Sequence, residues 1–129
     1  MRNVKVIVEY DGTDFFGFQW QSGRRTVQGT LEEALSRITK EPIKLVGAGR
    51  TDAGVHALGQ VINFKTNGSI PAERISVALN ATLPQDVRAK GAEEVSESFN
   101  ARRSAVSRLY RYVILNSMYP SAICGRYVW

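Results

Sequence analysis

Residues 49–61 read GRTDAGVHALGQV, a small, glycine-rich stretch that lies between two apolar runs. The runs at 43–46 and 61–64 have the composition of strands. Asp52 is the one carboxylate of the stretch, and Gly49 and Gly54 bracket it. This composition is typical of a tight connection that lets a substrate approach the main chain. The stretch therefore predicts two strands joined by a loop that carries Asp52.

The pattern leaves two interpretations of Asp52 open. Arg50 precedes Asp52 by two residues, and side chains at this spacing share a face in an extended segment. A guanidinium there favours the ionised carboxylate and fixes its orientation, as a functional site requires. Alternatively, Asp52 only starts a turn, a position where aspartate is common.

GRTDAGVHALGQV resembles the signature of the TruA-type tRNA pseudouridine synthase family, whose catalytic aspartate lies in the RTDAGVHA segment. The resemblance implies that Asp52 is the catalytic residue. The match is long, contiguous and rich in uncommon choices. Three further pieces are similar to the same family: YDGT at 10–13, GFQWQ at 17–21 and TVQGTLEEAL at 26–35.

Composition predicts one soluble domain spanning residues 1–129. The chain is 43% hydrophobic and 22% charged, as folded proteins are. A net charge of +5 favours an anionic partner, with nucleic acid ahead of an acidic membrane. Alternatively, the charge only keeps the surface soluble. The chain has one cysteine, which excludes an intrachain disulfide. With one cysteine and one histidine, it also has few ligands for a metal site. Without a membrane-span or signal-peptide pattern, the protein is expected to be cytoplasmic.

The order of elements predicts an α+β fold. Strands are expected at 4–9, 43–48, 58–66, 87–95 and from 107, and helices at 26–40 and from Pro71 to about 83. The first helix begins after Thr26, or at a capping box of Thr30 and Glu33. The order β-α-β-β-α-β-β fits a ferredoxin-like (RRM-like) split βαβ sheet, with both helices on one face and the other face open.

The loop at residues 13–25 is rich in aromatic and basic side chains. It holds four aromatic residues and two arginines, Arg24 and Arg25. Aromatic side chains in a loop either plug the core or stack on a flat ligand. We expect two of the four to plug the core, and we expect the others to contact nucleic acid together with the two arginines.

The segment 99–115 also mixes arginines with tyrosines, at Arg102, Arg103, Arg108, Tyr110, Arg111 and Tyr112. From residue 107, strand periodicity places Arg108 and Tyr110 on one face, where packing and RNA contact both remain open. The family's RxYxYxI segment matches residues 108–114, which implies that Tyr110 is the active-site tyrosine. The family's upstream FHARFSA pattern is replaced at Asn100 and Arg103, whose contacts stay open.

Two function classes fit these patterns: an enzyme that isomerises uridine in RNA, and a non-catalytic RNA-binding domain. Asp52 favours the enzyme, because anion binding gains nothing from a central carboxylate. Isomerisation breaks N1–C1′ and joins C5 to C1′ without redox change or water, so no metal or organic cofactor is expected. Asp52 would act as nucleophile at C1′ or as base at C2′, and the sequence leaves both open.

Substrate contacts are expected from six residues. Arg50 would hold Asp52 and fill the space left in the RNA by an extruded base, and Tyr110 would stack on that base. Phosphate contacts are expected from Arg24, Arg25, Arg102 and Arg108. The resemblance further implies a homodimer that acts on the anticodon stem-loop of tRNA. Family members are about twice as long, so residues 1–129 are expected to form the N-terminal half of the synthase fold, inactive without its C-terminal half.

Overall fold

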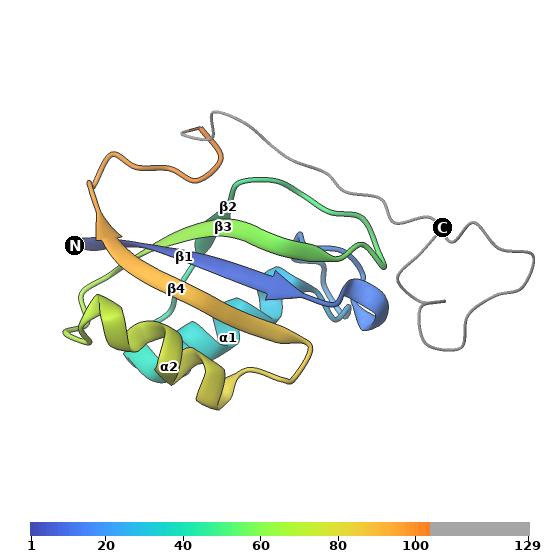
Figure 1. The fold of residues 1–129 in the computed structure, drawn as a ribbon, viewed down its shortest axis with the longest axis horizontal. Helices are drawn as coiled ribbons and strands as arrows, with labels where there is room; N and C mark the ends of the chain where they lie inside the picture. The colour runs from blue at the N-terminus through green and yellow to red at the C-terminus, as the bar shows by residue number, and fades with distance from the viewer. Residues whose placement is uncertain (104–129) are drawn as a thin grey trace, which may run out of the picture.

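A computed structural model of the chain describes residues 1–103, which form a four-stranded antiparallel sheet and two α-helices. Figure 1 shows the elements in order: β1 (Arg2–Tyr10), the 3-10 helix η1 (Gly12–Asp14), α1 (Val27–Thr39), β2 (Leu45–Gly47), β3 (Ala57–Thr66), α2 (Ala72–Thr82) and β4 (Val87–Val95). The strand predicted from residue 107 lies outside the described residues.

The sheet has the strand order β2-β3-β1-β4, and each neighbouring pair is antiparallel. The strands joined through α1 are β1 and β2, and they are parallel with β3 between them. The strands joined through α2 are β3 and β4, and they are parallel with β1 between them. This interleaving of two βαβ units confirms the predicted ferredoxin-like α+β arrangement.

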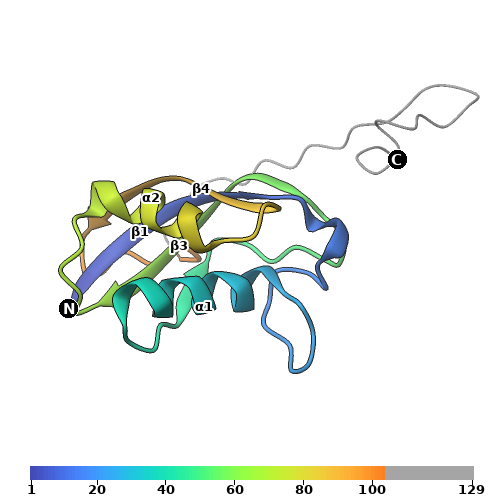
Figure 2. The same cartoon turned by 90° about the horizontal axis from the view of Figure 1, so that it is seen from below.

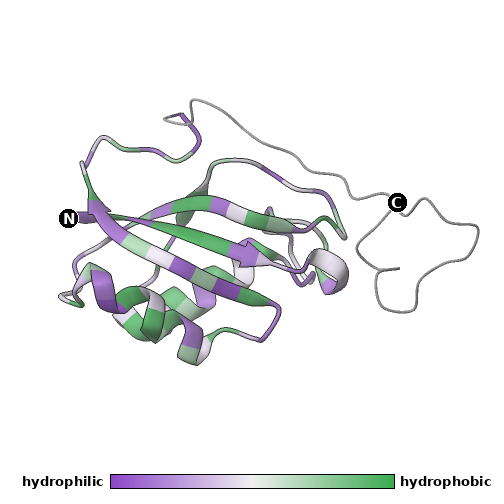
Figure 3. Cartoon of the chain, viewed as in Figure 1, coloured by the Kyte–Doolittle hydropathy of each residue, from purple (hydrophilic) through white to green (hydrophobic). Residues whose placement is uncertain are grey.

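One face of the sheet forms the core with both helices (Figures 1 and 2). Alternate residues of β1 are fully buried, and Val4 and Val6 lie opposite Phe64 and Ile62 of β3. The helices complete the same cluster with Leu31, Leu35, Ile75 and Leu79. Figure 3 shows the central β1 as mostly hydrophobic and the outer β4 with several hydrophilic residues. No helix within residues 1–103 is long and apolar enough to cross a bilayer.

The ends of both helices follow from local hydrogen bonds and proline. Thr26 is the N-cap of α1, and its side chain accepts a hydrogen bond from the Gly29 N–H at 3.1 Å. The structure therefore selects Thr26 over the capping box at Thr30. Pro71 is the N-cap of α2 rather than its first helical residue. The helix ends before Leu83, as expected for a residue that precedes proline.

Strand β2 is shorter than the predicted 43–48. Side chains of α1 accept hydrogen bonds from backbone N–H groups near the start of β2. The Ile43 N–H donates to Ser36 Oγ at 3.2 Å, and the Leu45 N–H donates to a Glu32 carboxylate oxygen at 3.1 Å. These amides face the helix and not another strand, so the run before Leu45 packs as an irregular segment.

The sheet face opposite the helices, which was expected to be open, is partly covered by the chain after β4. Asn3 Nδ2 donates to the carbonyls of Ser96 and Phe99, both at 2.9 Å. Asn63 Nδ2 donates to Asn3 Oδ1 at 3.0 Å, and Asn63 Oδ1 accepts from the Ala101 N–H at 2.7 Å. Both asparagines are buried. They hold the chain after β4 across this face.

Candidate active site

The connection between β2 and β3 lies against the loop that follows β1, at the end of the sheet where β1 finishes (Figure 1). Two main-chain hydrogen bonds join the two segments: the Phe18 N–H donates to Thr51 O at 3.0 Å, and the Gly54 N–H donates to Phe15 O at 3.3 Å. These bonds flank Asp52 on both sides. The Asp52 segment is therefore docked on the aromatic loop and not suspended in solvent.

Two buried polar side chains anchor the incoming arm of this connection. The Tyr10 hydroxyl, at the end of β1, lies 2.8 Å from Thr51 Oγ1. The Gln60 side chain spans Gly49, since its Nε2 donates to Gly49 O at 2.8 Å and its Oε1 accepts from the Gly49 N–H at 3.2 Å. The strands β1 and β3 therefore fix the backbone next to Asp52.

Asp52 opens a β-turn whose backbone is closed by the Val55 N–H, which donates to Asp52 O at 3.1 Å. Gly54 is the third residue of the turn and has φ +81°, as a type II turn requires. The interpretation of Asp52 as a turn residue is thus correct for its backbone. Its side chain is exposed, and within residues 1–103 no hydrogen bond or ion pair engages its carboxylate. The turn presents this carboxylate to solvent.

Arg50 is exposed, and it does not form the expected pair with Asp52: the ion pairs within residues 1–103 do not join these two side chains. The expectation assumed an extended segment. Strand β2 ends at Gly47 and β3 begins at Ala57, so the two residues lie outside any strand and the alternation of side chains does not apply.

The four loop aromatics divide as predicted. Phe15 and Phe18 are 3% exposed, whereas Phe16 and Trp20 are 47% and 55% exposed. Phe18 packs so closely on Gly47 that a β-carbon there would lie 2.6 Å from its ring. Two aromatic rings thus plug the core, and two stay at the surface of the loop whose backbone docks on the Asp52 segment.

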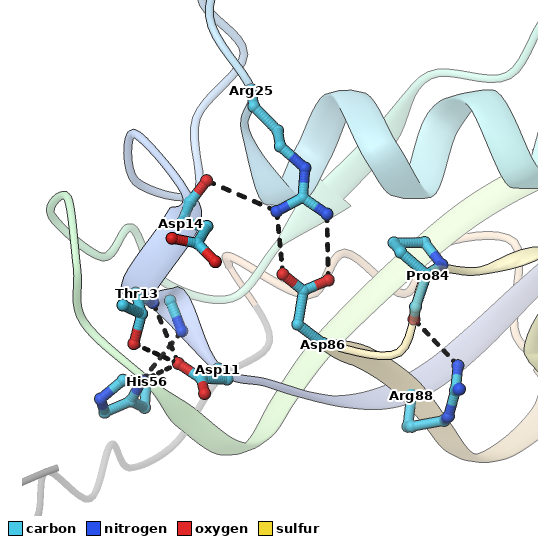
Figure 4. Close-up of polar contacts among 9 residues, drawn as sticks. Asp11, Thr13, Asp14, Arg25, His56, Pro84, Asp86 and Arg88 are labelled. Carbon is cyan, nitrogen blue, oxygen red and sulfur yellow. Dashed lines mark hydrogen bonds and ion pairs between the residues drawn. The ribbon is translucent and has the colours of Figure 1, made fainter. Parts of the chain in front are cut away.

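The adjacent arginines Arg24 and Arg25 have different environments. The Arg24 guanidinium lies 4.6 Å from the centre of the exposed Phe16 ring. Arg25 makes two hydrogen bonds to Asp86, at 2.8 and 3.0 Å (Figure 4). Its guanidinium also lies 4.0 Å from the centre of the buried Phe15 ring. Hydrogen bonding to Asp86 raises the pKa of Arg25 above its ordinary value.

This division follows from what each arginine contacts. Arg25 ties the aromatic loop to the residue just before β4, while Arg24 forms an exposed cation–π pair. Sequence reasoning gave both the same role and missed Asp86, which carries no motif and lies 61 residues along the chain.

The remaining predicted residues lie at the end of the described chain or beyond it. Arg102 and Arg103 are exposed, and their N–H groups both donate to Asn100 Oδ1 at 3.0 Å. Asn100 thus closes the turn that presents the two arginines. Arg108 and Tyr110 lie outside the described residues. Across residues 1–103, no group of three His, Cys, Asp or Glu side chains is arranged to hold a metal ion.

Fold and loop together define an α+β domain that presents a carboxylate from the connection between two strands. A family model described as tRNA pseudouridine synthase matches residues 6–102, which covers most of the sheet, both helices and the Asp52 segment. The chain therefore belongs to the tRNA pseudouridine synthase family.

Curated relatives named tRNA pseudouridine synthase A are similar along the whole chain. The protein from Caldicellulosiruptor saccharolyticus is 51% identical over 129 residues, which are 100% of this chain and 53% of the relative. The protein from Acetivibrio thermocellus is 54% identical over 123 residues, which are 95% of this chain and 50% of the relative. The chain spans about half the length of the curated relatives it matches.

Proposed function

We propose that this chain supplies the catalytic carboxylate of a tRNA pseudouridine synthase and that Asp52 is that group. One observation carries the proposal: an exposed carboxylate, engaged by no partner within residues 1–103, stands on a turn whose flanking backbone is docked on both sides. Membership of the family, and relatives named tRNA pseudouridine synthase A, support the same assignment.

The reaction defines what Asp52 has to do. The N1–C1′ bond breaks, the uracil turns, C5 joins C1′, and a proton leaves C5 while N1 gains one. Atoms and electrons balance without a cofactor. An ionised carboxylate at the ribose acts either as nucleophile at C1′ or as base at C2′. Both roles need an accessible side chain on a backbone that does not move, because misplacement of a reacting group is costly in rate.

The aromatic loop on which the Asp52 segment docks suits RNA. The exposed Phe16–Arg24 pair and Trp20 offer stacking surface and positive charge for an unpaired region of RNA. Arg24 and Arg102 are the proposed phosphate contacts. Arg50 is proposed to fill the space that the extruded base leaves in the RNA. Arg25, engaged by Asp86, supports the loop and is at most a secondary contact.

The substrate proposed here is the anticodon stem-loop of tRNA, bound by a homodimer in the cytoplasm. Extrusion of a uridine costs a few kcal/mol and requires a surface that receives the base. Tyr110 is the proposed stacking residue, and Arg108 a further phosphate contact. The second half that the curated relatives possess would supply the opposite wall of the site.

A second candidate is an RNA-binding domain without chemistry. The exposed Phe16–Arg24 pair favours it, since stacking and charge alone suffice for binding single strands. The two candidates differ in what they require of Asp52, because a carboxylate adds nothing to the affinity for phosphate.

The decisive test replaces Asp52 by asparagine, which removes the charge and keeps the shape. The assay uses residues 1–129 joined to the second half of the Caldicellulosiruptor saccharolyticus relative and an unmodified tRNA transcript. Pseudouridine formation should fall at least about a hundredfold, with tRNA affinity nearly unchanged.

The matched control is Glu73→Gln, which removes one exposed carboxylate from α2 and should leave the rate unchanged. Turnover by Asp52→Asn within tenfold of the parent would refute the catalytic assignment and favour the binding domain. The 129-residue chain alone should bind tRNA weakly and show no turnover. Turnover by that chain would refute the need for a second half.

A further inference from the structure

His56 is the one histidine of the chain, and it ends the connection that carries Asp52. Its Nδ1 accepts a hydrogen bond from the Gly12 N–H at 2.9 Å and also lies 3.2 Å from Asp11 Oδ1 (Figure 4). The imidazole is 30% exposed. One ring nitrogen thus faces both a backbone donor and a carboxylate.

The two contacts of Nδ1 exclude each other. The nitrogen accepts from Gly12 only when it carries no proton, which places the ring proton of the neutral imidazole on Nε2. A proton on Nδ1 would be donated to Asp11, and the buried Gly12 N–H would lose its acceptor. Asp11 does not depend on His56, because its Oδ1 already accepts from the Thr13 N–H at 3.0 Å and the Thr13 hydroxyl at 2.5 Å.

The contact between Gly12 and His56 is linked to Asp52 through the three intervening residues of the turn, 53–55. A β-carbon on Gly12 would lie 1.9 Å from Val55 O, so the two main chains touch with no room for a side chain. The Val55 N–H closes the turn that begins at Asp52. A shift of His56 away from Gly12 would therefore move the outgoing arm of the turn.

The outgoing arm has the same kind of anchor as the incoming one. Tyr10 holds Thr51 before Asp52, and Gly12 holds His56 after it. Tyr10 ends the central strand β1, and Gly12, two residues later, begins the 3-10 helix η1. The turn is therefore held at both arms by one short and well-supported piece of chain.

We propose that His56 is a positioning residue for Asp52, and that it acts through an unprotonated Nδ1 that fixes the turn on Gly12. This proposal rests on the proposed catalytic role of Asp52. The proposed role of His56 involves no contact with a reacting atom. Asp11 is the acidic group that the structure places against the ring, and it competes with Gly12 for Nδ1 whenever the ring is protonated.

The first test is spectroscopic and uses the 129-residue chain. Because the chain has one histidine, its ring ¹⁵N resonances are assigned without ambiguity. In the neutral imidazole, Nδ1 should carry no proton and Nε2 should carry one. On acidification, the Gly12 amide resonance should shift with the same midpoint as the ring. A neutral imidazole with its proton on Nδ1, or a Gly12 amide resonance that does not respond when the ring is protonated, would overturn the proposal.

The second test compares His56→Asn with His56→Leu in the joined synthase described above. Asparagine keeps an acceptor close to the position of Nδ1, and leucine removes it. His56→Leu should lower kcat roughly 10- to 100-fold with little change in KM for tRNA, since displacement of a catalytic group by 1 Å costs about that much. His56→Asn should restore kcat to within about threefold of the parent.

The outcomes separate this proposal from the proposed function. An active Asp52→Asn variant contradicts the function itself. An inactive Asp52→Asn beside a His56→Leu with parental kcat contradicts only the positioning role. The positioning role is also contradicted if His56→Asn and His56→Leu lose the same amount of kcat and this loss matches a decrease in the fraction of folded protein. If His56→Leu does not fold, the kcat of His56→Asn and the imidazole tautomer of the parent still test the positioning role.

Discussion

Gly17 lies directly against Thr51: a β-carbon on Gly17 would stand 2.8 Å from the Thr51 carbonyl oxygen. The same carbonyl accepts the Phe18 N–H at 3.0 Å. The aromatic loop and the Asp52 segment therefore meet main chain to main chain. The geometry of the proposed catalytic turn depends on a residue without a side chain in a different loop.

Gly17→Ala is expected to be more destabilising than Gly23→Ala. Both glycines have positive φ, +84° and +73°, so an alanine at either costs about 1–2 kcal/mol of backbone strain. Only Gly17 has a neighbour in the way, since nothing lies within 4 Å of a β-carbon on Gly23. The difference in urea midpoint measures the contact with Thr51. Equal losses of stability would show that the two loops separate readily.

Arg25→Ala should lower the free energy of unfolding by about 1 kcal/mol, because it removes a two-pronged, partly exposed ion pair and a cation–π contact. The control is Arg37→Ala, whose partner Glu33 is one helical turn away and where both side chains are about two-thirds exposed. That change should cost about 0.5 kcal/mol or less. A double-mutant cycle with Asp86→Ala isolates the pair, and a coupling near zero would contradict its supporting role.

Arg24→Ala should weaken tRNA binding without a loss of stability. If on the order of four phosphates are neutralised, the log–log slope of affinity against salt should lie near −3 to −4, and loss of Arg24 should reduce its magnitude by about one. Arg25→Ala should leave the slope nearly unchanged because Asp86 already neutralises that charge. A parental slope near zero would show that the basic residues serve only as a soluble surface.

Asn63→Ala should cost about 1–3 kcal/mol, since it leaves the Ala101 N–H without its acceptor and the buried Asn3 without its donor. Amide exchange at Ala101 should accelerate more than at Val6 in the sheet centre. The exposed Asn67→Ala is the control and should be nearly neutral. Unchanged exchange at Ala101 would mean that residues 96–103 are held by other contacts.

The fold was predictable because its signals are local. Val4, Val6 and Val8 alternate with less buried residues, and the apolar residues of α1 recur at helical spacing. The start of α1 was not decidable, because Thr26 and Thr30 both have the local form of a cap. Packing made the choice: a start at Thr26 places the fully buried Val27 inside the helix.

The turn at Asp52 was predictable from the sequence, and the contacts that support it were not. The Asp52 segment has a distinctive sequence, and its turn follows from Gly54. The contacts that hold it join residues far apart in the chain, such as Gly12 with His56, and no local pattern encodes such pairs. The same holds for the aromatic loop. Its composition indicated that two of the four rings are buried, but the loop has no periodicity from which the two buried rings could be identified.

The central place of β1 in the sheet has a consequence for synthesis. β1 leaves the ribosome before its partner strands, since Ile7 pairs with Val61 on one side and with Gly91 on the other. At about 5–20 residues per second, the apolar face of β1 waits roughly 5 to 20 s for both partners to be translated. Folding therefore depends on closing long loops, which is slow compared with helix formation. During that interval β1 is an exposed hydrophobic strand, which a ribosome-associated chaperone would engage.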